Sequence, residues 1–373
     1  MKTSLSFICF LFLFSCNIKP DFSNPKDVVS IYQNLINKGR IEEAFELISD
    51  SSKNILTFQD FREFYNLEFD SLIMANSFVI EDIKQMPIDA DFPNYRSYEF
   101  KELAINKITN DSSRRYYYVR VKNTGNNGWR VVWTKHLEKV AGQMEVKSNN
   151  DNGLSVCDKI LNYDPLNGDA YLTKAWIYFR SGNNLMLEQT GTKLLNLEPK
   201  NPQSHVIMAA IYDTKGLYES AKISNQKALL FTDDPEEISQ IFSNTSVICE
   251  SLNQLDSAIH YLRMANINLV KTHALWRLAK IYERKNNSDS SMYYFNKALI
   301  NSPMDNYLQI QLYCDYADFL VRHAETLDKD SDSQKELILK AKNVVLKALD
   351  LDPNDSDAKN ILDKIKNRVL TLP

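Results

Sequence analysis

Two short stretches, 162–165 (NYDP) and 196–199 (NLEP), indicate the architecture of this chain, because their prolines lie 34 residues apart. The same ending returns at 347–353 (KALDLDP), and the stretch 297–299 (KAL) precedes Pro303. Self-similarity at a fixed period of about 20–50 residues is typical of proteins built from stacked structural units. The second half of the chain is therefore predicted to be a repeat array.

The pattern resembles the tetratricopeptide repeat, a 34-residue unit of two antiparallel helices. In that family, small residues lie where the helices cross and proline follows the second helix. The resemblance implies an all-α solenoid over 140–370. Its units begin near residues 168, 202, 239, 272 and 307, after a degenerate unit over 140–165 and before a polar capping helix over 355–370. Leu187 and Gly191 depart from the template, which has alanine and an aromatic residue at these positions.

Stacked units of this kind leave a concave groove lined by the first helix of each unit. The resemblance implies that a protein or peptide partner binds there, and Trp and Arg are the usual anchors of interfaces. The groove candidates are Trp176, Phe179, Arg180, His273, Trp276, Lys280 and Arg284. The alternative is that these side chains pack against neighbouring helices or against the N-terminal domain.

The first residues, 1–16 (MKTSLSFICFLFLFSC), predict where the protein is sent. Lys2 is followed by an apolar run that is too short to span a bilayer but fits a signal peptide. Residues 13–16 (LFSC) resemble a bacterial lipobox, which implies cleavage before Cys16 and acylation of its sulfur. The alternative is an ordinary secretory signal with Cys16 near the cleavage site. We expect a signal peptide over 1–15, a tether over 16–24, and a lipid anchor in the bacterial envelope. The expected membrane is the outer one, on its periplasmic or surface face.

Residues 25–138 predict an α+β domain. Helical apolar spacing covers 25–36 and 41–48, and Thr57 is a predicted N-cap of a third helix. The period then changes, and strands are predicted at 78–83, 98–101, 116–122 and 129–134, with a hairpin loop at 124–128. The last two strands alternate, so that in 116–122 the apolar side chains are predicted on one face and the polar ones, including Arg120, on the other. Helices followed by antiparallel strands predict helices on a curved sheet.

The opening 25–49 (PKDVVSIYQNLINKGRIEEAFELIS) and the closing 123–139 (NTGNNGWRVVWTKHLEK) resemble the nuclear transport factor 2-like, cone-shaped α+β superfamily. Folds of that superfamily often hold a pocket between sheet and helices. Tyr117, Trp129 and Trp133 are the pocket candidates, and the alternative is that they are core residues. Some members are enzymes with a pocket Asp or His as base. No histidine precedes His136, so catalysis is not carried over.

Composition narrows the function further. The 373 residues are 44% hydrophobic and 25% charged, with a formal net charge of -4 and only 9 glycines. This balance excludes wholesale disorder and a polytopic membrane protein, and it argues against a nucleic-acid binder, which usually has a basic excess. Cys157, Cys249 and Cys314 lie in helical apolar patterns and are predicted to be buried thiols. The sequence contains no phosphate-loop or nucleophile motif, and no cofactor or metal is predicted.

Together these observations predict a membrane-anchored, non-catalytic envelope lipoprotein that binds a protein or peptide partner through its groove and acts as a scaffold or assembly factor. The first alternative is a lipoprotein that captures a small molecule, peptide or glycan in the N-terminal pocket. The second is an enzyme of the cone-shaped superfamily.

Overall fold

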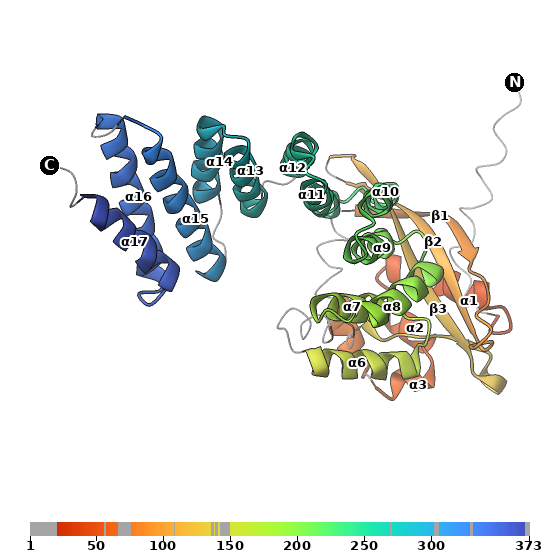
Figure 1. The fold of residues 1–373 in the computed structure, drawn as a ribbon. Coiled ribbons are helices and arrows are strands. Elements are labelled where there is room, and N and C mark those ends of the chain that lie inside the picture. Colours follow the sequence, from red (N-terminus) through yellow and green to blue (C-terminus); the bar gives the residue numbers. More distant parts are fainter. Residues whose placement is uncertain are drawn as a thin grey trace, which may run out of the picture. The chain divides into compact units, whose positions relative to one another are not determined.

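A computed structural model describes the chain over residues 21–55, 57–65, 76–107, 109–135, 138, 141, 150–268, 271–301, 306–328 and 331–369. Cys16 and His136 lie outside the described residues. Figure 1 labels the helices and strands in chain order. The chain forms two compact units. The first contains the chain up to Lys215 together with Leu230–Asp233, and the second contains Gly216–Leu229 and the chain from Asp234 onward. The predicted domain boundary near residue 139 therefore lies inside the first unit.

The first unit contains one antiparallel sheet with the strand order β1-β2-β3-β4. Its strands are β1 Asn76–Gln85, β2 Tyr95–Asn106, β3 Ser112–Asn123 and β4 Trp129–Val131. The alternation predicted for β3 is confirmed, with Val119 buried and Tyr117 packed against the core on one face. β4 is shorter than predicted because the chain turns away after Val131, where the Trp133 amide donates to Ser52 Oγ at 3.0 Å.

Helices cover one face of this sheet, as predicted. They are α1 Pro25–Asn37, α2 Ile41–Glu46, α3 Asp50–Lys53 and a helical stretch at 58–65. α1 begins where the Asn24 side chain accepts from the Lys26 amide, and Pro25 at the first helical position has no N–H to satisfy. The predicted cap at Thr57 is confirmed, since its Oγ1 accepts from the Asp60 amide at 3.2 Å. The apolar face of α1 packs on the sheet around Phe100.

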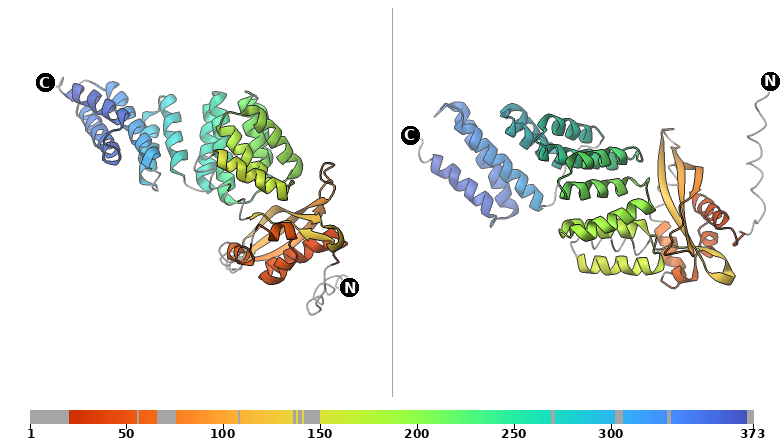
Figure 2. Two further views of the ribbon diagram at one scale, coloured as in Figure 1. Left: turned by 90° about the horizontal axis from the view of Figure 1, so that it is seen from below. Right: turned by 45° about the vertical axis from the view of Figure 1, so that its right-hand side comes forward.

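The other face of the sheet meets the first helical hairpins, so the sheet lies between two groups of helices (Figure 2). These helices are α6 Asn150–Tyr163, α7 Gly168–Arg180, α8 Asn184–Leu197 and α9 Pro202–Thr214. Asn167, Asn183 and Asn201 accept backbone hydrogen bonds at the starts of α7, α8 and α9. Each asparagine ends one helix-to-helix connection and starts the next helix.

The departure from the repeat template at Gly191 has a packing reason. A Cβ at this position would lie 2.6 Å from Ile211 Cδ1 and 2.7 Å from Ile207 Cγ2. Both isoleucines are on α9, so the missing side chain lets α8 and α9 approach closely. The repeat template has an aromatic side chain on the second helix at this position. In this chain, the isoleucine side chains of α9 fill the same space.

We therefore expect Gly191→Val to lower the free energy of unfolding of the first unit by about 1–3 kcal/mol, because an overpacked helix crossing must separate. Urea denaturation measures the change. Thr192→Val, at an exposed site on the same helix, is the control and should stay within about 0.5 kcal/mol of the parent protein. An unchanged midpoint for Gly191→Val would contradict the close crossing.

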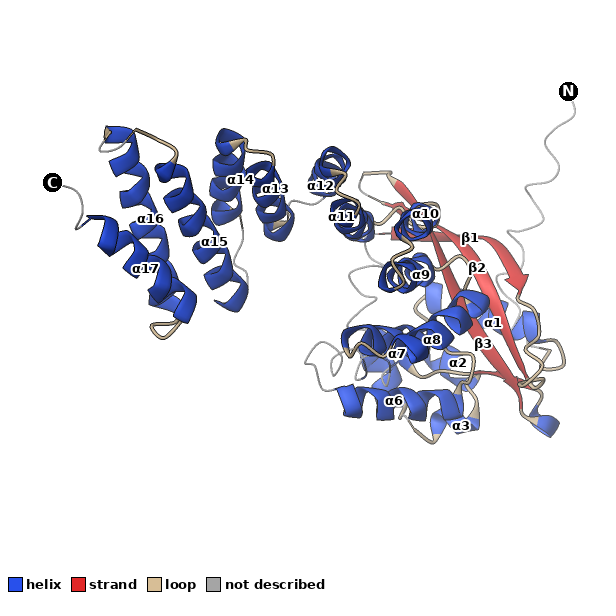
Figure 3. Cartoon of the chain, in the orientation of Figure 1, coloured by secondary structure: helices blue, strands red, loops and turns tan. Residues whose placement is uncertain are grey.

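Within the described residues, the second unit contains helices and their connections (Figure 3). They are α10 Tyr218–Ala228, α11 Pro235–Ser251, α12 Leu255–Asn268, α13 Thr272–Arg284, α14 Ser288–Ile300, α15 Asn306–Glu325, α16 Asp332–Leu351 and α17 Ser356–Val369. The predicted fold class, an α+β part followed by a helical solenoid, is confirmed. α11 begins at Pro235, four residues before the predicted start near 239, because the Asp234 carboxylate accepts from the amides of Glu236 and Glu237.

The core of the second unit confirms the role of small residues at helix crossings. Ala258, Ala279 and Ala298 are fully buried, and aromatic rings fill the space beside them. The thiols of Cys157 in the first unit and of Cys249 and Cys314 in the second are buried and form no disulfide, as predicted. Among the described residues, no helix is long and apolar enough to cross a membrane.

Candidate functional site: a buried ionic cluster and a cavity along strand β3

Strand β3 places a buried cation between the sheet and the first hairpins. Arg120 is 5% exposed, and its Nε donates to Asp164 Oδ2 at 2.5 Å while its Nη1 donates to Glu198 Oε1 at 3.2 Å. Asp164 and Glu198 are the acidic residues of the two stretches with 34-residue spacing. The residues before Pro165 and Pro199 therefore occupy equivalent places in two successive repeats. Both of their carboxylates bind the guanidinium of Arg120.

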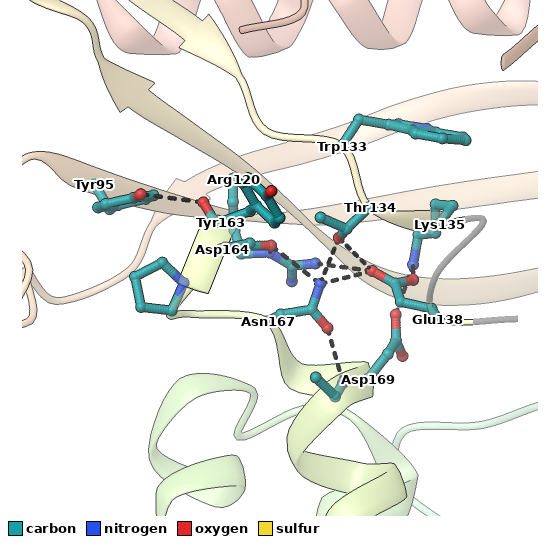
Figure 4. Close-up of polar contacts among 12 residues, drawn as sticks. Tyr95, Arg120, Trp133, Thr134, Lys135, Glu138, Tyr163, Asp164, Asn167 and Asp169 are labelled. Atoms are coloured by element: carbon teal, nitrogen blue, oxygen red, sulfur yellow. Dashed lines mark hydrogen bonds and ion pairs between the residues drawn. The ribbon is translucent and has the colours of Figure 1, made fainter. Parts of the chain in front are cut away.

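Asn167 extends this cluster toward the end of the sheet (Figure 4). Its Oδ1 accepts from the Ala170 amide, and its Nδ2 lies 2.6 Å from Glu138 Oε1 and 3.0 Å from Thr134 Oγ1. Lys135 Nζ then lies 2.7 Å from Glu138 Oε2 and 2.6 Å from Asp169 Oδ2. One continuous network therefore joins β3, the segment after β4 and the start of α7.

The cluster carries more negative than positive groups. The four carboxylates of Asp164, Glu198, Glu138 and Asp169 face the two cations Arg120 and Lys135. Burial and the negative charge of Asp169 raise the pKa of Glu198 to about 7, and burial also raises the pKa of Glu138. Asp164, Glu138 and Glu198 are shielded from solvent, whereas Asp169 is 42% exposed. Two cations cannot balance these carboxylates, so a proton held by Glu198 offsets part of the negative excess.

This imbalance predicts a pH dependence of stability. Because the pKa of Glu198 rises from 4.5 to about 7 on folding, the folded state binds more protons, and the unfolding free energy falls as pH rises across that interval. The loss amounts to at most about 3 kcal/mol. Glu198→Gln should reduce the slope of the unfolding free energy against pH between these two pH values. The other charged residues of the cluster are unchanged in this variant: Arg120, Lys135, Glu138, Asp164 and Asp169. Urea denaturation of both proteins from pH 4.5 to 8 measures this, and equal slopes would contradict the assignment.

Another buried carboxylate, outside the cluster around Arg120, lies on the opposite face of the sheet. Glu102 on β2 is fully buried and pairs with Arg115 of β3, whose Nε donates to Glu102 Oε2 at 2.6 Å. Asn37 Nδ2 at the end of α1 donates to Glu102 Oε1 at 2.9 Å, and the Tyr117 hydroxyl donates to the same oxygen at 3.3 Å. This carboxylate is fully compensated, in contrast to the cluster around Arg120.

A cavity of about 420 Å³ opens beside β3. Aromatic groups line its α1 side, where the Tyr32 and Tyr65 hydroxyls are 2.9 Å apart and Trp133 Nε1 donates to the Tyr65 hydroxyl at 3.3 Å. Burial raises the pKa of Tyr32, so its hydroxyl stays protonated. Charged groups line the opposite side, namely Arg120, Lys135, Glu138, Asp169 and Glu198. Arg115, which pairs with Glu102, is a third cation of the lining. The cavity therefore offers hydrogen-bonding aromatics together with charged groups of both signs.

The structure brings two of the three predicted pocket residues to this cavity. Tyr117 and Trp133 line it, and Tyr117 also stacks on Phe100 at 5.2 Å between ring centres. Trp129 is a core residue instead, 8% exposed, with the Arg96 guanidinium 5.0 Å above its ring. Trp129 belongs to β4, whereas Trp133 follows the turn that brings the chain past the cavity.

The groove candidates of the first unit lie on α7. Trp176 and Phe179 are half-buried against the core of the hairpin, with ring centres 5.8 Å apart, and Arg180 is exposed. Their rings thus serve hairpin packing and leave part of their surface open.

The groove candidates of the second unit lie on α13 and contact neighbouring helices. Trp276 is 7% exposed and its Nε1 donates to Asp315 Oδ2 of α15 at 3.0 Å. Lys280 Nζ reaches the same oxygen at 2.7 Å, and Arg284 Nη1 lies 3.3 Å from Glu250 Oε2 of α11. His273 is exposed, and its ring meets Trp276 edge-on with centres 6.0 Å apart. Trp276 is therefore a core residue, while Lys280 and Arg284 form surface ion pairs.

Sequence reasoning missed the ionic cluster and most of the cavity lining. In the sequence, Arg120 is one member of the polar face of β3, and the acidic residues before Pro165 and Pro199 are markers of the repeat. The signal that could have linked them is the pair of carboxylates at the same place in two successive units. Among the described residues, no group of three or more His, Cys, Asp or Glu side chains is placed to hold a metal ion.

Solved structures that resemble this chain include PilF of Pseudomonas aeruginosa, with 13% identity and a TM-score of 0.47. The similar region covers 62% of this chain and 96% of PilF. PilW, described as a widely conserved type IV pilus biogenesis factor, has 14% identity, a TM-score of 0.49 and coverages of 61% and 97%. A thermophilic TPR protein of Thermus thermophilus has 18% identity, a TM-score of 0.44 and coverages of 50% and 98%.

No curated protein gives a significant match to the chain. Residues 272–299, which contain α13 and most of α14, match the tetratricopeptide repeat family. The chain therefore contains a tetratricopeptide repeat.

Proposed function

We propose that this protein is a membrane-anchored, non-catalytic envelope lipoprotein that binds a protein partner on the surface formed by α11, α13 and α15 and acts as a scaffold or assembly factor. The observation that carries the proposal is a row of ion pairs with half-exposed cations that joins the first helices of three successive hairpins. Lys280 pairs with Asp315, Arg284 with Glu250, and Arg322 with Glu283.

These ion pairs can be replaced by ion pairs with a bound partner. The side chains of Lys280, Arg284 and Arg322 are about half exposed, and exposed ion pairs contribute only about 0–1 kcal/mol each to stability. A partner with charges of both signs can therefore replace these pairs at low cost, and it gains orientation from the fixed alternation of charge.

The test is crosslinked capture of partners from the native envelope with the double variant Lys280→Glu/Arg284→Glu. We expect the protein captured by the parent chain to be lost or strongly depleted. The control, Lys342→Glu/Lys347→Glu, makes the same change of charge at exposed sites on α16. Equal capture by the parent protein and the α13 variant would overturn the proposed surface.

The anchoring part of the proposal rests on residues 13–16 (LFSC). Cleavage before Cys16 and more than one acyl chain on this residue would hold the protein stably on a membrane, because each buried methylene contributes about 0.8 kcal/mol. Intact mass of the protein from membranes should show the lipid, and Cys16→Ala should release the chain into the soluble fraction. A mature protein without lipid would overturn the anchor.

The cavity beside β3 favours a second candidate function, the capture of a ligand. Its volume of about 420 Å³ falls in the range of ligand pockets, about 300–1,000 Å³. Its lining combines tyrosine hydroxyls with charged groups, which suits a ligand that has both apolar and polar parts.

A further inference from the structure

Among the described residues, the outer edge of β3 is unpaired between Arg114 and Arg120. β2 pairs with β3 from Ser112 to Lys122, whereas β4 on the other side pairs with Val121–Asn123 alone among the described residues. Edge strands present unpaired N–H and C=O groups that can accept another strand. The segment of β3 before residue 120 is such an edge.

The direction of the backbone groups along this edge follows from two hydrogen bonds. The Arg120 carbonyl accepts from the Val132 amide at 2.9 Å, and the Arg114 amide donates to Asp233 Oδ2 at 3.1 Å. Both groups point away from β2. Because every second residue of an antiparallel strand points to the same neighbour, the main chains of Tyr116 and Tyr118 point outward as well. No described residue hydrogen-bonds to their main-chain N–H or C=O on this side.

The cavity follows this edge. Six consecutive residues of β3, from Arg115 to Arg120, line it. Alternate side chains of a strand lie on opposite faces, so a cavity under one face would touch every second residue. A cavity that touches all six runs along the edge itself. At about 3.3 Å per residue, the stretch of β3 that lines the cavity is as long as about five residues of a paired strand.

The two sides of the cavity specify the side chains that such a strand would carry. Tyr65, Tyr117 and Trp133 lie on the α1 side and would receive apolar or aromatic groups. The cation on that side, Arg115, lies over the Tyr117 ring and is already paired with Glu102. On the other side, the carboxylates of Glu138, Asp169 and Glu198 outnumber the cations Arg120 and Lys135, so basic groups fit there.

We propose that the open edge of β3 at Tyr116 and Tyr118 binds an extended peptide as an added strand, with alternating apolar and basic side chains. This inference deepens the ligand-capture candidate and rests on it, and it is independent of the partner surface on α13. Main-chain hydrogen bonds to Tyr116 and Tyr118 give affinity, and the two sides of the cavity select the sequence.

The test uses the purified full-length chain in detergent and a blocked seven-residue peptide of alternating lysine and valine, with tyrosine at the centre. We expect binding in titration calorimetry and slower amide exchange across residues 115–119. N-methylation of the alternate peptide residues whose amides face β3 should weaken binding at least about tenfold, because each removed hydrogen bond costs about that much. N-methylation of the other residues should leave the affinity unchanged, and this peptide is the matched control.

Charge is tested separately. Glutamate in place of the peptide lysines should abolish binding, and Glu138→Gln in the protein should weaken binding of the lysine peptide, while Glu43→Gln on the exposed end of α2 should not. Equal loss with both N-methylated peptides, or unchanged exchange at residues 115–119, would overturn the proposal. Binding of a free aromatic compound or a polyamine in place of the peptide would also overturn it and would leave ligand capture standing.

Discussion

Replacement of Arg120 by methionine should lower the unfolding free energy of the first unit by about 3–5 kcal/mol. The change keeps most of the side-chain volume but removes the cation between Asp164 and Glu198, which are 0% and 6% exposed. A buried carboxylate without its partner must either ionise in a low-dielectric site or take up a proton, and both cost free energy. Urea denaturation followed by amide exchange within β2 and β3 measures the loss.

Arg40→Met is the matched control for this prediction. Arg40 pairs with Glu43 at the surface, where both side chains are about half exposed, so the expected loss is below about 1 kcal/mol. Adding Asp164→Leu and Glu198→Leu to Arg120→Met should recover most of the stability, since an apolar cluster replaces the stranded charges. A loss for Arg120→Met no larger than that for Arg40→Met would show that the cluster does not hold the unit together.

Phe295→Ala should destabilise the second unit by about 3–5 kcal/mol and leave the first unit unchanged. Phe295 on α14 is fully buried, stacked on Tyr316 at 4.9 Å and close to Phe319 at 5.4 Å between ring centres. Removing the ring opens a cavity between α14 and α15, in a repeat core where each hairpin is stabilised by its neighbours. Amide exchange within α14–α16 should speed up.

The control for Phe295 is Tyr293→Ala on the same helix. Tyr293 is 57% exposed, so its removal should change stability by no more than about 0.5 kcal/mol. If Phe295→Ala accelerated exchange in β2 and β3 as much as in α14–α16, the two units would have to unfold as one cooperative body, contrary to their separate cores.

The helices and strands were predictable because their signals are local. The 34-residue spacing of Pro165 and Pro199 located the hairpins, and the alternation of 116–122 located β3. The start of α11 was misplaced because the repeat template was extended over a local cap, Asp234 followed by Pro235. That cap was readable in the sequence and gives the correct boundary.

The site was less predictable because it depends on contacts between distant residues. Arg120 meets Asp164 and Glu198 across 44 and 78 positions of sequence. Trp276 fits an anchor by type and position on its helix, yet the Asp315 carboxylate that accepts from its indole is 39 residues away. Tyr117, Trp129 and Trp133 were predicted to line a pocket because they are aromatic. Trp133 reaches the cavity and Trp129 does not, because the chain turns toward the cavity only after β4.

The bridge made by Arg120 also sets an order of events during synthesis. The strand that carries Arg120 leaves the ribosome well before Glu198, 78 residues later. Until that residue emerges, the guanidinium lacks one of its two hydrogen-bonded carboxylates, and the sheet presents an uncovered face. The first unit can therefore complete its folding only after the stretch 196–199 has been synthesised. The sheet and the first hairpins then reach the native state together.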